Sequence, residues 1–333
     1  MQDDHLLEKR NKRPLIGVDL MGSDTLPEAL ASALVQLAEE NFPADFLVFV
    51  SPEVIGELPS TLNSVVCAET IEMIDDPITA VRRKKESSLC VGLRYLHDKT
   101  IDAFISAGNT GALLLAAKTT LQTLPGIDRP ALVTLLPTHK NELAVLDVGA
   151  NLSLKSHHIL QFAAMGIAYQ KSRGIEHPTV GLLNVGTEAI KGTPQIREAY
   201  AKLEHLNRLR PTFMGNIEGR DAFQGHIDVL VTDGFTGNVF LKTAEGLASF
   251  ILSQLERRAL EGPPSLQHEI SSLKERLYIA EHPGAILCGV DGIVMKCHGD
   301  TTPATFLSSI KGAVRLVEHS FLEKIISNLQ DIL

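Results

Sequence analysis

The sequence predicts an α/β fold of three layers, with a mainly parallel sheet between two layers of helices. Apolar runs of strand length alternate with segments of helical periodicity along most of the chain. Runs such as PLIGVDLM (14–21) and ALVTLLPT (131–138) are apolar almost throughout, which indicates strands that are buried on both faces. Several of these runs also end in a polar loop rich in Gly or Asn. Together these features are typical of βαβ units.

The first half of the chain gives the clearest alternation of the two patterns. The expected strands are 14–21, 46–50, 64–68, 102–107, 131–138 and 143–149. The expected helices are 26–40, 87–98 and 110–122. Pro27 falls in the first turn of its helix, where a missing N–H costs no helical hydrogen bond.

The second half continues the alternation and then changes character. Helices are expected over 155–173 and 194–209, and strands over 179–186 and 228–234. The stretch 239–281 instead predicts two long helices, broken by Glu261-Gly-Pro-Pro264, that form a hairpin projecting from the sheet core. Two short strand-like runs, 285–290 and 293–299, and a final helix after Pro303 follow.

These elements predict one two-lobed domain over 14–333, preceded by a flexible extension over 1–13, although the length also allows two domains. We expect the first lobe to span about 14–125 together with 282–333. The second lobe would span about 126–281 and include the hairpin. The length of 333 residues is ample for such an arrangement.

The composition limits the function classes. The chain is 44% hydrophobic and 21% charged, with a formal net charge of −9, so it is a poor candidate for general nucleic-acid binding. An acidic partner would have to meet a local basic patch. The charged N-terminus and the lack of an 18-residue apolar run predict neither a secreted nor a membrane-spanning protein, although contact with a membrane surface stays open. We expect a cytoplasmic protein.

The four cysteines carry no metal-binding or redox spacing. Cys67, Cys90, Cys288 and Cys297 form no CxxC pair and no His-Cys cluster with zinc spacing. They are interpreted as reduced core residues.

The polar loops at the strand ends predict a binding site for an anion. They are 19–24, 106–111, 147–151, 184–192, 214–221, 232–238 and 296–300. Ligands of open α/β sheets bind beyond the carboxyl ends of the strands, where glycine lets backbone N–H groups approach an anion at a helix start. The alternative is that each Gly-Asn pair simply makes a turn.

The residues near these loops favour phosphate over a metal ion. The chain has no GxGxxG, GxxxxGK[ST], GxSxG or HExxH motif. Cations do occur there: RRKKESS (82–88) precedes a helix, Lys191 and Lys242 follow Gly-rich loops, and His298 lies in one. Asn, Lys, Arg and backbone donors with few carboxylates suit phosphate, so neither a metal nor a cofactor is expected. The charge run also fits a solvated surface.

Several strings together resemble the bacterial PlsX family of acyl-ACP:phosphate acyltransferases. They are SAGNTGA, GIDRPAL, LDVGAN, GLLNVGTE with Lys191-Gly192, GNIEGRD and VTDGFTGNVFLKTAEG, and they occur in the family's order between about residues 15 and 315. MGSD and RRKKESS fit the same pattern. The chain departs from the family at Ser23, where glycine is usual, at Ser153 and Ser156, and in the threonines after His298-Gly.

The resemblance implies a fold similar to the isocitrate/isopropylmalate dehydrogenase and phosphotransacetylase group, and a homodimer. It implies that inorganic phosphate attacks a long-chain acyl-acyl carrier protein to give acyl phosphate and the free carrier. The acyl phosphate would pass to a membrane glycerol-3-phosphate acyltransferase in phospholipid synthesis, with the enzyme peripheral to the inner membrane face. No enzyme nucleophile is needed if phosphate is positioned well, because positioning alone supplies roughly 7–11 kcal/mol.

We assign roles to the loop residues as hypotheses. The loop Gly108, Asn109, Thr110 and Gly111 would hold phosphate or the oxyanion. The other expected substrate-binding residues are Arg83, Lys84, Asn151 and Lys242. The expected catalytic residues are His298, Asp233, Asn216 and Lys191.

Within this set, His298 would protonate the leaving thiolate, and the alternative is a turn histidine. Asp233 would orient that histidine or bind the proton of phosphate, and the alternative is a helix N-cap. Asn216 would donate to the oxyanion, and Lys191 would be a phosphate-holding cation.

Contacts with the acidic carrier protein and with other surfaces have less support in the sequence. Arg208–Arg210 or Arg257–Arg258 would form a docking patch, or be ordinary surface charge. Leu247, Phe250, Ile251 and Leu255 recur at helical spacing, which fits a core stripe as well as a membrane or dimer surface.

Three rival functions remain open from the residues alone. They are a decarboxylating dehydrogenase, for which the expected Asp cluster is not evident, a phosphotransacetylase that uses coenzyme A, and a scaffold that binds phosphate and carrier protein without turnover.

Overall fold

The computed structural model divides the chain into two compact units. It describes residues 13–40, 42–205, 212–259, 263–280, 284–299 and 301–332. The first unit takes its described residues from the segments up to Gln122 and from Val290–Leu322, and the second from Thr123–Gly289 and Glu323–Leu333. The second unit thus takes the C-terminal helix and the strand after residue 284, which we had expected in the first lobe. The predicted flexible extension lies almost wholly outside the described residues.

The first unit is a parallel sheet in the order β3-β2-β1-β4-β11. Its strands are β1 (Leu15–Asp19), β2 (Asp45–Val50), β3 (Asn63–Val66), β4 (Ala103–Ser106) and β11 (Ile293–Lys296). Every residue of β4 and β11 is buried, as the continuous apolar runs predicted.

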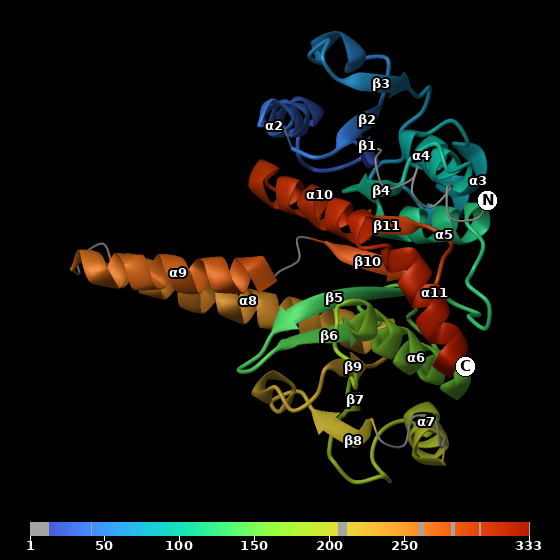
Figure 1. The fold of residues 1–333 in the computed structure, drawn as a ribbon, viewed down its shortest axis with the longest axis vertical. Coiled ribbons are helices and arrows are strands. Elements are labelled where there is room, and N and C mark those ends of the chain that lie inside the picture. The colour runs from blue at the N-terminus through green and yellow to red at the C-terminus, as the bar shows by residue number, and fades with distance from the viewer. Residues whose placement is uncertain are drawn as a thin grey trace, which may run out of the picture. The chain divides into compact units, whose positions relative to one another are not determined.

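Helices cover both faces of this sheet, and Figure 1 shows them on opposite sides of the strands. On one side lie α2 (Pro27–Glu39) and α10 (Pro303–Glu318). On the other lie α3 (Pro77–Arg83), α4 (Ser88–His97) and α5 (Thr110–Thr120). The three-layer α/β prediction is therefore confirmed, whereas the short helix α3 was not predicted.

The second unit has the strand order β10-β5-β6-β9-β7-β8. Its strands are β5 (Ala131–Pro137), β6 (Glu142–Leu146), β7 (Val180–Asn184), β8 (Phe213–Glu218), β9 (Val229–Val231) and β10 (Ala285–Cys288). Pairs β6–β9, β9–β7 and β7–β8 are parallel, whereas β5 is antiparallel to both neighbours. Its helices are α6 (Ser156–Ser172), α7 (Pro194–His205), α8 (Gly234–Ala259), α9 (Pro264–Ala280) and α11 (Phe321–Ile332).

Two of the predicted loops are regular structure. Residues 214–218 of the loop expected over 214–221 belong to the strand β8. The helix expected from residue 239 begins at Gly234, so most of the predicted loop 232–238 is its first turn.

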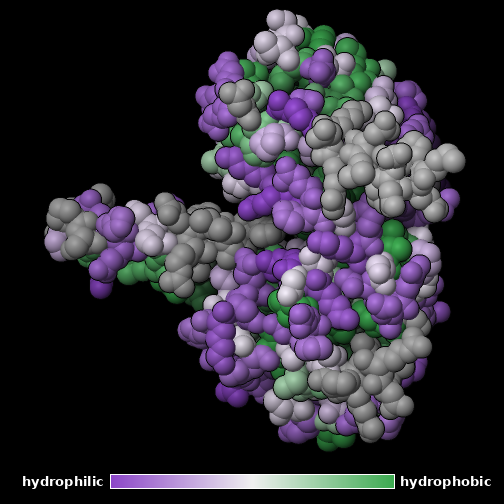
Figure 2. All heavy atoms as spheres, in the orientation of Figure 1, coloured by the Kyte–Doolittle hydropathy of each residue, from purple (hydrophilic) through white to green (hydrophobic). Residues whose placement is uncertain are grey.

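The predicted helical hairpin is present as α8 and α9, which lie side by side and extend away from the strands of their unit (Figure 1). Lys274 of α9 is paired with Glu256 of α8 at 2.6 Å. On α8, Leu247, Phe250 and Ile251 are 57%, 61% and 46% exposed, and Figure 2 shows apolar side chains along the hairpin. Leu252, not Leu255, is the member of this region buried in the hairpin.

All four cysteines are free and buried, and burial raises the pKa of Cys67 and of Cys288 to about 12. None of the described helices is both long enough and apolar enough to cross a bilayer.

Candidate functional site

Three buried polar side chains stand in a row where β1, β4 and β11 end. Asp19 pairs with Ser106 in the β1–β4 register, and Ser106 pairs with Lys296 in the β4–β11 register. Their exposed fractions are 2%, 0% and 7%. Charged side chains are rarely buried unless they are paired or functional. This row lies at the carboxyl ends of the strands, where ligands of α/β folds bind.

Hydrogen bonds join this row to the beginning of the loops that follow β1 and β4. Ser106 Oγ donates to Asp19 Oδ2 at 2.8 Å and accepts the N–H of Gly108 at 3.1 Å. The other oxygen of Asp19, Oδ1, accepts the N–H of Met21 at 3.0 Å. Burial raises the pKa of Asp19 to about 6, against the opposing effect of hydrogen bonds from Ser88, Met21 and Ser106 and of the charge of Lys296.

Asn109 fixes the start of α5 in two ways. Its Oδ1 accepts the N–H of Ala112 at 3.1 Å, which is an N-cap. Its Nδ2 donates to the carbonyl oxygens of Glu72, Met73 and Asp75 at 3.1–3.3 Å. The amide we expected to face the oxyanion is thus occupied by structural contacts. The N–H groups of Thr110 and Gly111, which have no partner within the helix, are the better anion donors.

The cationic side chains of residues 82–85, just before α4, lie in different environments. Lys84 Nζ lies 2.6 Å from Asp75 Oδ2 and donates to the carbonyl of Thr70 at 2.8 Å. That ion pair joins the segment to the loop that Asn109 holds, and Lys84 lowers the pKa of Asp75. Arg83 is exposed.

The loop that carries His298 contacts the loop after β1. The N–H of Asp24 donates to the carbonyl of Gly299 at 2.9 Å, and Thr25 Oγ1 donates to the carbonyl of Thr301 at 2.7 Å. The imidazole of His298 is exposed at this place. The loops 19–24, 106–111 and 296–299 therefore do converge within the first unit.

In the second unit, the loop after β6 wraps around a carboxylate. Asp147 is fully buried, and its two oxygens accept the N–H groups of Leu132, Gly149, Ala150 and Asn151 at 2.6–3.2 Å. The side-chain amide of Asn151 adds a further donor at 2.9 Å. Burial raises the pKa of Asp147, and these donors oppose the rise.

The start of α8 packs directly on this loop. The N–H of Gly234 donates to the carbonyl of Asn151 at 2.8 Å, and a Cβ at Gly237 would lie 1.9 Å from the carbonyl oxygen of Asp147. Asp233 caps the helix, since its Oδ1 accepts the N–H of Thr236 at 2.9 Å. The N-cap alternative for Asp233 is therefore present in the structure, and its catalytic role stays a prediction. Asn151 is likewise engaged in its own loop.

Asn216 and the 184–192 loop form a second group in this unit. Asn216 is 5% exposed, and its Nδ2 donates to the carbonyl of Glu188 at 2.9 Å. Its Oδ1 is buried with no hydrogen-bond partner, which costs free energy. Lys191 is exposed at the end of the same loop, and Gly192 adopts a φ of 87°, with Asn184 Nδ2 donating to the carbonyl of Lys191 at 3.2 Å.

The remaining predicted cations lie on the surface of α8 or outside the described residues. Lys242 is paired with Glu245 at 2.8 Å on α8. Arg257 and Arg258 are exposed near the end of α8. Arg208–Arg210 lie outside the described residues.

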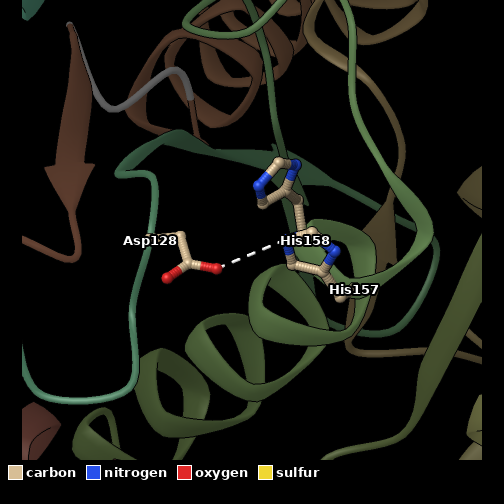
Figure 3. A group of neighbouring side chains, drawn as sticks. All are labelled: Asp128, His157 and His158. Atoms are coloured by element: carbon tan, nitrogen blue, oxygen red, sulfur yellow. Dashed lines mark ion pairs between the residues drawn. The ribbon is translucent and has the colours of Figure 1, made fainter.

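One group of possible metal ligands, Asp128, His157 and His158, has its ligand atoms within 4.8 Å of one another (Figure 3). His157 Nε2 lies 3.3 Å from Asp128 Oδ2, and His158 Nδ1 accepts the N–H of Lys155 at 3.2 Å. Both histidines lie in the first turn of α6, whose positive end disfavours a cation. Burial, His157 and Arg129 lower the pKa of His158 to about 4, so the surroundings also disfavour positive charge. We interpret the group as a network that fixes the start of α6.

The sequence analysis did not identify the buried row as a unit. It placed Asp19, Ser106 and Lys296 only within three separate loops, 19–24, 106–111 and 296–300. The available signal was that each is the last, polar residue of an otherwise apolar strand.

Comparisons with known proteins agree with this architecture. The family model described as "Fatty acid synthesis protein" matches residues 15–324. A phosphate acyltransferase of Chlamydia abortus is 40% identical over 324 residues, covering 94% of this chain and 98% of the relative. One of Brevibacillus brevis is 40% identical over 329 residues, covering 95% and 97%. A phosphotransacetylase structure from Streptococcus pyogenes superposes with a TM-score of 0.60 at 16% identity, covering 99% and 98%, which shows the fold alone. The chain belongs to the fatty acid synthesis protein family, PlsX, and is a phosphate acyltransferase.

Proposed function

We propose that this enzyme transfers a long-chain acyl group from acyl carrier protein to inorganic phosphate. The observation that carries the assignment of phosphate is the 106–111 loop, which the buried row and Asn109 hold rigidly at the start of α5. Its free first-turn N–H groups and the positive helix end suit an anion. The family relation supports phosphate as the acceptor.

In this reaction a phosphate oxygen attacks the thioester carbonyl carbon. The new C–O bond forms, the C–S bond breaks, and its electron pair leaves on sulfur. Hydrogen phosphate loses one proton and the thiol gains one, so no net proton is consumed. Donors aimed at the oxyanion are typically the largest catalytic term. We assign to His298 the delivery of the proton to sulfur, because its exposed imidazole lies in a loop that hydrogen-bonds to the loop after β1.

The acyl phosphate would be consumed by a membrane glycerol-3-phosphate acyltransferase. This places the enzyme in the cytoplasm, at the inner membrane face, in phospholipid synthesis. The exposed apolar side chains of α8 support contact of the hairpin with a partner copy in a homodimer or with that membrane face. Of the two arginine pairs that we expected to dock the acidic carrier protein, Arg257–Arg258 lies within the described residues and is exposed on α8.

The decisive experiment mixes the protein with long-chain acyl-acyl carrier protein and phosphate, and traps acyl phosphate as hydroxamate with hydroxylamine. We expect hydroxamate that depends on phosphate and survives a metal chelator. A parallel reaction with acyl-coenzyme A tests the phosphotransacetylase-like alternative. Faster hydroxamate formation from acyl-coenzyme A than from acyl-acyl carrier protein would show that coenzyme A thioesters are the preferred acyl donors. If the protein binds phosphate but forms no hydroxamate from either donor, the result would favour the scaffold that binds phosphate and carrier protein without turnover.

A further inference from the structure

The peptide that joins Ala107 to Gly108 is held at both ends by the buried row. Lys296 Nζ donates to the carbonyl oxygen of Ala107 at 3.3 Å, and it also donates to the carbonyl oxygen of Cys297. On the other side of the same peptide, the N–H of Gly108 donates to Ser106 Oγ at 3.1 Å. The orientation of this peptide sets where the following N–H groups of the loop point.

A lysine is an unusual residue to hold a buried peptide, and Lys296 is only 7% exposed. Lysine is almost never buried unless it is paired, since burial of an ammonium group costs free energy. Carbonyl contacts of the kind found here would be made equally well by a neutral donor. An ammonium adds a positive charge beneath the loop, in surroundings where charges are poorly screened, and the ionised carboxylate of Asp19 in the same row opposes part of it.

We propose that Lys296 is a positioning residue for phosphate: it fixes the Ala107–Gly108 peptide and supplies the charge that makes the 108–111 loop selective for an anion. This inference rests on the proposed assignment of phosphate to that loop. Lys296 does not touch the reacting atoms. It acts through the carbonyl of Ala107 and through its field.

Removal of Lys296 alone would also harm the fold, because Asp19 would stay buried without the opposing charge. The double variant Asp19→Asn/Lys296→Met removes both charges and separates the two effects. Lys118→Met is the matched control, since Lys118 is exposed in the last turn of α5 and its loss changes the net charge equally.

The test measures binding of inorganic phosphate alone to the full chain by calorimetry, beside the unfolding midpoint in urea. We expect Lys296→Met to lower the midpoint and to raise the Kd for phosphate tenfold or more. In the double variant the midpoint should recover while the Kd stays raised, and Lys118→Met should bind like the wild type. Where activity is present, the KM for phosphate should rise far more than kcat falls.

A double variant that binds phosphate within twofold of the wild type would overturn the inference, because Lys296 would then serve stability alone. A wild-type chain that binds no phosphate would overturn it as well. Failure of the proposed function looks different: the wild type would bind phosphate, Lys296→Met would weaken that binding, and neither would make acyl phosphate.

Discussion

Gly237 packs against the main chain of Asp147 so closely that a Cβ at position 237 would lie 1.9 Å from the Asp147 carbonyl oxygen. The neighbouring Gly234 is similarly confined by Asn151. The two glycines of TDGFTGN therefore let the first turn of α8 sit on the 147–151 loop. Their positions are explained by packing of a helix on a loop, without a ligand.

Gly237→Ala should destabilise the second unit, because a backbone oxygen cannot move aside as a flexible side chain can. We expect a loss of about 3 kcal/mol or more in the free energy of unfolding, measured by urea titration. Gly246→Ala in the same helix is the control, since a Cβ there meets nothing within 4 Å. That change should stabilise by about 1 kcal/mol, as alanine replaces glycine in a helix. Equal effects of the two substitutions would contradict the packing argument.

Asn109→Asp should destabilise the first unit at least as much as Asn109→Ala. Both variants lose the amide donor to the carbonyls of Glu72, Met73 and Asp75, and the aspartate keeps the N-cap worth about 1 kcal/mol. The aspartate, however, turns a carboxylate toward three carbonyl oxygens. Urea titration of the three proteins decides the order, and an aspartate variant as stable as the wild type would show that the cap alone matters.

The alternation of strands and helices was predictable because each buried strand is a continuous apolar run. The strand β8 was missed because it lacks such a run: only one of its six residues is buried, and Gly215 and Asn216 interrupt the apolar residues. The helix α3 has seven residues and a charged C-terminal end, so its periodicity is too short to detect. The antiparallel placement of β5 depends on tertiary pairing that local patterns do not encode.

The candidate site was predictable as a set of loops but not as a set of contacts. The Gly-Asn spacing of 106–111 correctly placed a loop before α5. It did not reveal that Asn109 uses its amide on the 72–75 segment, because that segment is distant in sequence. The row of Asp19, Ser106 and Lys296 needs the strand order and register, which the sequence alone does not supply.

Asp19 should give the wild type a specific pH dependence of stability. Burial raises the pKa of Asp19 from 3.8 to about 6, so the folded chain holds this proton more tightly than the unfolded chain does. The contribution of Asp19 to stability is therefore greatest below pH 4 and is lost as the pH rises to about 6. At about 1.4 kcal/mol for each pH unit, the loss is on the order of 3 kcal/mol.

The Asp19→Asn variant provides the comparison that isolates this carboxyl. The difference in unfolding free energy between wild type and variant should shift by that amount, in favour of the variant, between pH 4 and pH 7. Urea titrations across this range measure it. A difference that is independent of pH would mean that folding does not change the pKa of Asp19.

His298→Ala should slow acyl transfer by about 10²–10⁴-fold, the usual range for loss of a positioned general acid. The defect should depend on the leaving group, because an aryl thiolate is stable enough to depart without a proton. We expect the ratio of wild-type to variant rates to fall when an acyl aryl thioester replaces the acyl-acyl carrier protein. His97→Ala is the control, since His97 is an exposed histidine of the same unit, paired with Asp98 at 2.9 Å. Phosphate-dependent hydroxamate formation gives the rates, and a variant as fast as the wild type at every pH would remove His298 from the mechanism.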